Sequence, residues 1–121
     1  MKLTKILAIT ILSVSPLSSM AGEITVAMYE EVSKAHDPKL DKIIMMNLTG
    51  LGQGIEWYNT MAKDSKLYCT PSQLTLGVSN YEDILNRQIK GLRMVDPDYD
   101  TDSLPLGLVL LQGLIRTFPC K

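Results

Sequence analysis

The stretch from Ser103 to Cys120, SLPLGLVLLQGLIRTFPC, constrains the fold more than any other part of the chain. Residues 104–118 are apolar on nearly every face of the helix they would form, and a helix that is hydrophobic all round is normally buried. The segment is too short to cross a membrane, which takes roughly 20 apolar residues. Pro119 predicts its end, since helical geometry is disfavoured before a proline. We therefore expect a buried C-terminal helix, in which Gly107 and Gly113 allow another helix to approach closely.

The N-terminus has the pattern of a secretory signal peptide. Two lysines precede a short apolar run over residues 6–14, and Ser19-Met20-Ala21 supplies the small residues of a cleavage site. A membrane anchor would need a longer apolar run, and no cysteine stands at the cleavage site to carry a lipid. We therefore expect residues 1–21 to be removed, which leaves a single exported domain over residues 22–121 without a membrane anchor.

Charge and residue chemistry narrow the function. The exported part keeps all 13 acidic residues and loses two of the 12 lysines and arginines, so its net charge is −3 with His36 neutral. A mildly acidic domain without a basic patch argues against nucleic acid as a partner. No cluster of metal ligands, nucleophile beside a base or rigidly placed carboxylate pair supports catalysis. We expect a binding protein, not an enzyme, with no cofactor and no metal.

Cys69 and Cys120 are the only cysteines in the sequence. In an exported protein an isolated pair of cysteines is expected to form a disulfide. The alternative is a catalytic thiol assisted by His36, the only histidine, and one cysteine with one histidine gives this alternative little support. We therefore expect a disulfide between Cys69 and Cys120.

The first half of the expected domain has two helical patterns. Thr25 is a candidate N-cap for a short helix that ends before His36, and Asp37-Pro38 resembles a cap followed by proline at the first helical position. Apolar residues then recur every three or four positions over residues 40–62, which predicts an amphipathic helix of about 25 residues.

Three glycines, at positions 50, 52 and 54, interrupt this long pattern. We expect them to allow close packing against the C-terminal helix or to mark a kink. A loop that cradles phosphate would need a preceding strand and a different glycine spacing. Trp57, a few residues further on, is expected in the core or at a dimer surface.

Two sequences with capping-box spacing predict two further helices. Thr70-Pro71-Ser72-Gln73 would open a short helix that ends at Gly77, and Ser79-Asn80-Tyr81-Glu82 would open a longer one that Asp96-Pro97 stops. The fold class is therefore all-α. We expect a bundle of about four to five helices around the buried C-terminal helix, stapled by one disulfide.

The segment from Asp96 to Ser103 is the candidate functional site, because it holds four of the 13 carboxylates. A calcium loop is one alternative, although the EF-hand pattern would require Gly at position 101 and Glu at position 107. A second is a solvated loop whose Asp102 and Ser103 cap the C-terminal helix. The third is an acidic recognition loop that attracts a basic partner. In this third alternative the candidate partner-binding residues are Asp96, Asp98, Tyr99, Asp100 and Asp102.

Short motifs over residues 40–121 share their order and spacing with one known family. They are Gly54-Ile55-Glu56-Trp57 followed by Asn59, Leu67-Tyr68-Cys69-Thr70-Pro71 followed by Leu74, Ile84-Leu85, Leu104-Pro105-Leu106 and Phe118-Pro119-Cys120. By these motifs the chain resembles the Rap/Tai family of immunity proteins, which protect bacteria against type VI secretion amidase effectors. The match comes from the series of motifs behind a signal peptide and not from any single one.

The resemblance implies an all-helical periplasmic homodimer that binds a cognate peptidoglycan amidase effector and blocks its active-site cleft. It also implies that Cys69 pairs with Cys120. An alternative from another functional class is a small periplasmic acid-stress holdase chaperone, whose dimer would dissociate at low pH and expose apolar surface. Carboxylates would have to drive that change, because the chain has a single histidine, His36.

Overall fold

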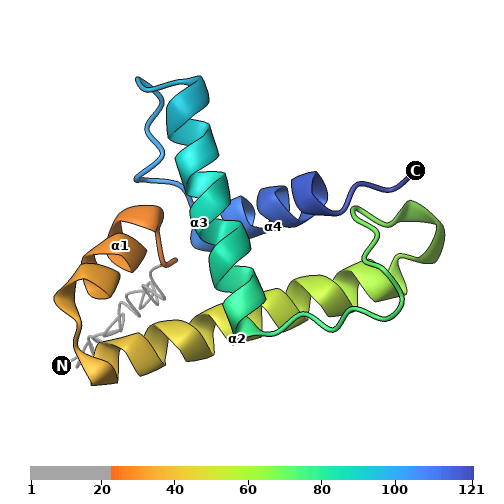
Figure 1. Ribbon diagram of the computed structural model, residues 1–121, viewed down its shortest axis with the longest axis horizontal. Coiled ribbons are helices and arrows are strands. Elements are labelled where there is room, and N and C mark those ends of the chain that lie inside the picture. Colours follow the sequence, from red (N-terminus) through yellow and green to blue (C-terminus); the bar gives the residue numbers. More distant parts are fainter. Residues whose placement is uncertain (1–22) are drawn as a thin grey trace, which may run out of the picture.

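The computed structural model describes residues 23–121, and these residues form a small all-α bundle (Figure 1). Their elements are α1 (Val26–Ala35), α2 (Pro38–Met61), the 3-10 helix η1 (Lys63–Ser65), α3 (Val78–Val95) and α4 (Leu106–Thr117). The all-α prediction is confirmed. The predicted signal peptide lies outside the described residues. None of the helices in the described part has the length and apolar content that spanning a membrane requires.

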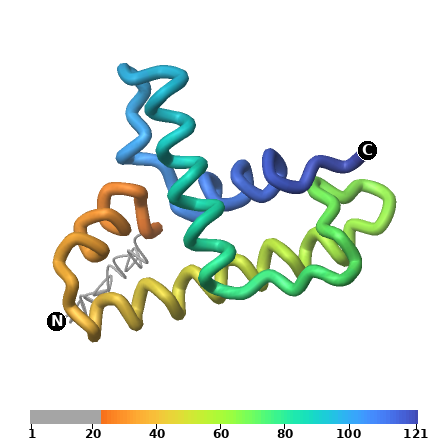
Figure 2. Tube along the Cα trace, in the orientation of Figure 1, coloured from red at the N-terminus to blue at the C-terminus, as the bar shows by residue number. Residues whose placement is uncertain are grey.

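The helices are arranged around the crossing of α2 and α3. Figure 2 shows α2 along one side of the molecule and α1 beside its N-terminal part. Helix α3 starts near the middle of α2 and runs away from it, while α4 packs against α3. One end of α3 is therefore in the body of the bundle, and the other end projects from it.

The starts of α1 and α2 follow the predicted caps. Thr25 is the N-cap of α1, and its hydroxyl accepts a hydrogen bond from the Met28 amide at 3.4 Å. Asp37 is the N-cap of α2 and accepts a hydrogen bond from the Lys39 amide at 2.8 Å, with proline at the first position. Between the two helices His36 adopts a left-handed conformation with a φ of 50°. Local capping chemistry therefore sets this corner of the fold.

The prediction of a short helix that opens at Thr70 is wrong. The segment is extended apart from a turn in which the Leu74 amide donates to the Pro71 carbonyl at 2.9 Å. Tyr68 and Leu76, at its two ends, are both buried in the core, and an extended chain satisfies both positions. Gly77 was predicted to end that helix, but it is the N-cap of α3. The Gly77 amide donates a hydrogen bond to Asn80 Oδ1 at 2.8 Å.

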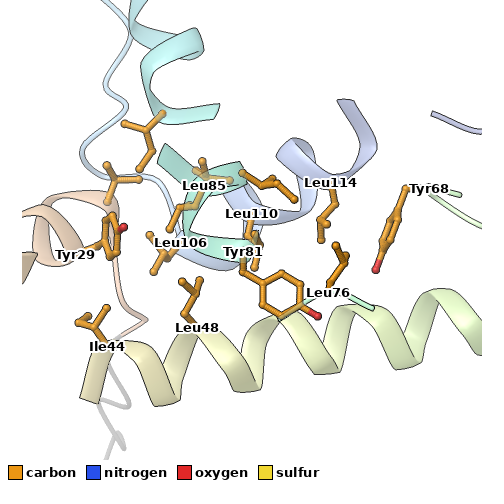
Figure 3. Close-up of a cluster of buried hydrophobic side chains, with 14 residues drawn as sticks. Tyr29, Ile44, Leu48, Tyr68, Leu76, Tyr81, Leu85, Leu106, Leu110 and Leu114 are labelled. Atoms are coloured by element: carbon orange, nitrogen blue, oxygen red, sulfur yellow. The ribbon is translucent and has the colours of Figure 1, made fainter. Parts of the chain in front are cut away.

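The core lies between α2, α3 and α4 (Figure 3). Helix α4 contributes the most completely buried side, since Leu106, Val109, Leu110 and Leu114 are all at most 1% exposed. Its opposite side remains open, with Leu108 43% exposed, so α4 is buried along one side and not all round as its composition suggests. The close approach expected at a glycine is confirmed at position 113. A Cβ there would lie 2.7 Å from Ile84 Cγ2 of α3.

The three glycines of α2 have different environments. Gly52 lies against the ring of Tyr81, so the close packing occurs with α3 and not with the predicted C-terminal helix. A methyl group at Gly50 or Gly54 would meet nothing within 4 Å. Trp57 is 69% exposed, so the prediction that it lies in the core is wrong. The alternative prediction, that it lies at a dimer surface, stays a prediction.

The end of α2 and the end of the chain are joined at one place. Asn59 is buried and holds the connecting segment, because its Nδ2 donates to the Tyr68 carbonyl and its Oδ1 accepts from the Leu67 amide, both at 2.8 Å. The Cys69 amide donates to the Phe118 carbonyl at 2.8 Å, and Cys69 forms the predicted disulfide with Cys120. Neither sulfur is a free thiol, so the catalytic-thiol alternative is wrong.

Candidate partner-binding site

The acidic segment forms the loop between α3 and α4, at the end of α3 that projects from the bundle (Figure 1). The chain leaves the helix at Asp96, whose amide still donates to the Leu92 carbonyl at 3.1 Å. It then returns along α3 to Pro105, where α4 begins. We call the exposed residues around this turn, Met94 to Asp100, the tip.

Hydrogen bonds within the loop fix its shape. The Tyr99 amide donates to the Asp96 carbonyl at 3.2 Å, and the Thr101 amide donates to the Tyr99 carbonyl at 2.7 Å. Asp96 Oδ1 accepts a further hydrogen bond from the Asp98 amide at 3.2 Å. Thr101 is only 2% exposed and anchors the loop against the bundle. The tip is therefore a set of tight turns on a buried base.

Arg93 ties the loop to α1. Its Nη1 and Nη2 donate to Glu30 Oε1 and Oε2 at 2.8 and 2.9 Å, and Nη2 also donates to Asp102 Oδ1 at 2.6 Å. The hydrogen bonds that Arg93 donates lower the pKa of Glu30 below its ordinary value. The same bonds to Glu30, and next the bond to Asp102, raise the pKa of Arg93 above its ordinary value. A two-pronged arginine–carboxylate pair fixes geometry as well as charge. Asp102 is thus committed to holding the loop in place.

Backbone hydrogen bonds attach the returning half of the loop to the start of α1. The Ala27 amide donates to the Asp102 carbonyl and the Val26 amide to the Leu104 carbonyl, both at 3.0 Å. The Leu106 amide, at the start of α4, donates to the Ile24 carbonyl at 2.8 Å. The predicted cap of the C-terminal helix by Asp102 and Ser103 is therefore wrong. Helix α4 has no side-chain cap because neighbouring backbone satisfies its first amide.

The tip carries three unpaired carboxylates and three exposed apolar side chains. Within residues 23–121 the only ion pairs are those of Arg93, so Asp96, Asp98 and Asp100 have no cationic partner there. Tyr99 is 50% exposed, while Met94 and Val95, in the last turn of α3, are 72% and 79% exposed. A groove of about 300 Å³ beside the tip is lined by Arg93, Pro97, Tyr99, Asp100, Thr101 and Asp102.

Three of these residues were not singled out from the sequence. Met94 and Val95 were missed because they continue the sequence of α3. The one sequence signal of their exposure is their position, which falls outside the buried face that contains Ile89. Arg93 could not be recognised as the anchor, because its partner Glu30 is 63 positions away. Of the predicted site residues, the structure groups Asp96, Asp98, Tyr99 and Asp100 at the tip and places Asp102 at its base.

The chemistry of the loop favours protein contacts over metal binding. Within the described part of the chain, no three His, Cys, Asp or Glu side chains are arranged to hold a metal ion, including the carboxylates of the calcium alternative. The tip can instead offer apolar contact area from Met94, Val95 and Tyr99, and it has free carboxylates for basic side chains. No family model, curated protein sequence or solved structure matches this chain.

Proposed function

We propose that this protein is a periplasmic immunity protein that binds a cognate type VI secretion peptidoglycan amidase effector and occludes its active site. Two things support the proposal. The order of motifs over residues 40–121 resembles the Rap/Tai family, and the tip combines exposed carboxylates with exposed apolar side chains.

One observation carries the proposal above all: the tip is acidic, apolar at its centre and rigidly held. Arg93 and the backbone of α1 fix its base, so little conformational freedom remains to be lost on binding. The unpaired carboxylates attract a cleft with a basic rim, and Tyr99, Met94 and Val95 fill its apolar interior. Substrate is then excluded sterically, without any chemistry by the immunity protein.

The direct test uses a small amidase encoded beside this protein's gene, which the proposal requires to exist. Isothermal calorimetry should give tight binding with one amidase for each chain. Peptidoglycan hydrolysis should fall in proportion to the amount of protein added and reach zero at equivalence. Tight binding without inhibition would contradict occlusion, and the absence of binding would overturn the proposal.

The tip is tested by replacing Asp98, Tyr99 and Asp100 together with alanine. We expect a loss of affinity of at least about 100-fold, because hot-spot residues carry most of the binding free energy. The matched control removes two carboxylates and a tyrosine elsewhere on the surface, by replacing Glu31, Asp83 and Tyr58 with alanine. Equal affinities of the two triple variants would remove the tip from the interface.

The alternative of an acid-stress holdase chaperone has one observation in its favour, which is the exposed apolar surface on α2. A chaperone would suppress the aggregation of unrelated unfolded proteins at low pH, and its activity would not depend on the tip. Protection of such clients by the triple-alanine tip variant, together with no amidase binding by the native chain, would favour this alternative.

A further inference from the structure

Helices α3 and α4 enclose a groove beside the point where they touch. Gly113 of α4 allows the contact, since a Cβ there would lie 2.7 Å from Ile84 Cγ2 and 3.3 Å from Gln88 Cβ. The groove has a volume of about 350 Å³. It is lined by Ile84, Arg87 and Gln88 of α3 and by Gly113, Arg116 and Thr117 of α4.

Two arginines line this groove, one from each helix, and neither is neutralised. Every ion pair within residues 23–121 belongs to Arg93, so Arg87 and Arg116 have no acidic partner there. Asp83, one helical turn before Arg87, contributes its backbone carbonyl, which accepts a hydrogen bond from Arg87 Nε at 3.4 Å. A groove lined by charge of one sign concentrates ions of the opposite sign. The two unpaired guanidinium groups therefore indicate a site for an anion.

Gly91 makes room for the Arg116 side chain on α3. It lies inside the helix, where glycine is less favourable than alanine. The one atom within 4 Å of the place where its Cβ would be is Arg116 Nη1, at 3.2 Å. Gly91 is four residues after Arg87, so the two positions share one face of α3. The glycine thus allows a guanidinium group from α4 to rest on the same face of α3 as Arg87.

Gln88 distinguishes this groove from an ordinary surface that bears arginines. It is only 6% exposed, and none of the hydrogen bonds within residues 23–121 involves its side chain. Its amide is not sealed in the interior, because the sealed side-chain atoms without a partner in that part of the chain are those of Asn47 and Tyr68. Buried polar groups are normally hydrogen-bonded. The partner of Gln88 must therefore enter through the groove, as water in the free protein and as a ligand group in a complex.

The groove also has hydrogen-bond acceptors beside its positive charge. The Thr117 hydroxyl donates to the Gly113 carbonyl at 2.7 Å, so toward a ligand it can only accept. The Gln88 amide can accept through its oxygen and donate through its nitrogen. A matching ligand therefore joins an anionic group to an N–H donor. Sulfate and phosphodiesters have no such donor.

We infer that this groove binds the free C-terminal carboxylate of a peptide chain. The carboxylate lies between Arg87 and Arg116, because a planar guanidinium group matches its two oxygens. The last peptide N–H donates to Gln88 Oε1 or to Thr117 Oγ1, and a small apolar side chain covers Ile84. The inference does not rest on the proposed function, because none of these residues belongs to the tip.

NMR titration of the purified protein with N-acetyl-alanyl-alanine tests the class of ligand. We expect saturable shifts in the signals of residues 84–88 and 113–117. The same peptide with a terminal carboxamide should bind at least about 10-fold more weakly, because it loses charge-assisted hydrogen bonds. Sodium sulfate is the control for a general anion site. The absence of binding, equal binding of acid and amide, or sulfate binding as tight as that of the peptide would overturn the inference.

Substitutions with a charge-matched control test the place of binding. Arg87→Gln and Arg116→Gln should each lower the affinity for the acetylated peptide by about 10-fold. Lys42→Gln removes the same charge at an exposed position of α2 and should leave the affinity unchanged. Equal losses in all three variants would mean that net charge, and not the groove, attracts the peptide, which would overturn the inference.

Gln88→Met tests the part played by the buried amide. Methionine has a similar volume, and Gln88 has no partner to lose within residues 23–121, so urea unfolding should show no loss of stability. The affinity for the peptide should nevertheless fall by at least about 5-fold. A loss of stability with unchanged affinity would make Gln88 a structural residue and remove it from the site.

Free peptides and whole proteins both have such a carboxylate, and binding of the amidase separates these two sources. If the groove holds the chain end of the amidase, Arg116→Gln should weaken that complex by about 10-fold, and so should removal of the last residues of the amidase. If the groove holds free peptides, Arg116→Gln should weaken peptide binding alone. The peptide titration decides the inference whether or not an amidase binds.

Discussion

Arg93 is the residue on which the position of the loop depends most. It stands in the last turn of α3, where the helix dipole favours a positive charge. Its guanidinium bonds to Glu30 of α1 and to Asp102 of the loop, and it thereby joins three segments that are far apart in sequence. This side chain fixes the tip more than any carboxylate of the tip does.

Arg93→Gln should lower the free energy of unfolding by about 1 kcal/mol. The pair with Glu30 is two-pronged, but 39% of the Arg93 side chain is exposed, so solvent screens much of the attraction. Arg87→Gln, on the same helix, is the control and should have nearly no effect, because Arg87 forms no ion pair. Urea unfolding of the three proteins measures both values. Equal losses would mean that the Arg93 contacts do not stabilise the bundle.

The difference between native chain and Arg93→Gln should also depend on pH. The pKa of Glu30 is lowered from its ordinary value of 4.5 by the hydrogen bonds from Arg93. A group whose pKa is lower in the folded state adds stability that is fully present above the unfolded value and is lost as pH falls through the folded value. The difference should therefore be constant above pH 4.5 and shrink below it. A difference that does not shrink as the pH falls below 4.5 would contradict the assignment to Glu30.

Gly52 and Gly50 should respond in opposite ways to alanine. A methyl group at Gly52 overlaps the Tyr81 ring, so Gly52→Ala should destabilise the fold by about 1–3 kcal/mol. At Gly50 the methyl group meets nothing, and the gain in helix propensity should stabilise the fold by up to about 1 kcal/mol. Thermal unfolding of both variants makes the comparison. A stabilising Gly52→Ala would contradict the close contact of α2 with α3.

At the scale of the elements, local signals predicted the helices and tertiary contacts decided the rest. Caps at Thr25 and Asp37 and regular apolar spacing predicted α1 and α2 correctly. The segment 70–77 has a capping-box spacing, yet it is extended because Tyr68 and Leu76 must both reach the core. The acidic loop was predicted as the candidate site, whereas its anchoring by Arg93 depends on a partner brought near only by the fold.

Several of the motif residues that carry the family resemblance join elements of the fold. Glu56 Oε2 accepts a hydrogen bond from the Tyr81 hydroxyl at 3.1 Å, which links α2 to α3. Burial, and then the charge of Glu56, raises the pKa of Tyr68 to about 12, so its hydroxyl remains neutral. Other motif residues are exposed, among them Trp57 at 69% and Leu67 at 42%. The motifs therefore describe the bundle and say little about which partner it binds.

Asn59→Ala should destabilise the protein by about 2–3 kcal/mol. Its side chain satisfies the amide of Leu67 and the carbonyl of Tyr68 in a buried place, and losing it leaves those backbone groups without partners. Thr60→Ala is the control, because the neighbouring hydroxyl is exposed and bonds only to the Glu56 carbonyl of its own helix. Urea unfolding compares the two variants. A similar loss in both would mean that water replaces Asn59 without cost.

At the scale of the whole molecule, α3 joins the body of the bundle to the tip. Helix α2 lies at one end of α3, and the tip lies at the other end (Figure 1). Helix α3 connects them through the Gly52–Tyr81 contact at one end and Arg93 at the other.

The disulfide should supply a large part of the total stability. It joins residues 51 positions apart, and the closed loop contains α3, the tip and α4. Restricting the unfolded chain over that length is worth about 4 kcal/mol in the chain-entropy view. Replacing both cysteines with serine should lower the free energy of unfolding by about that amount, and a reducing agent should do the same to the native chain while leaving the double variant unchanged. A loss below about 1 kcal/mol would mean that the Asn59 contacts and the Cys69–Phe118 backbone bond already hold the two ends together in the unfolded ensemble.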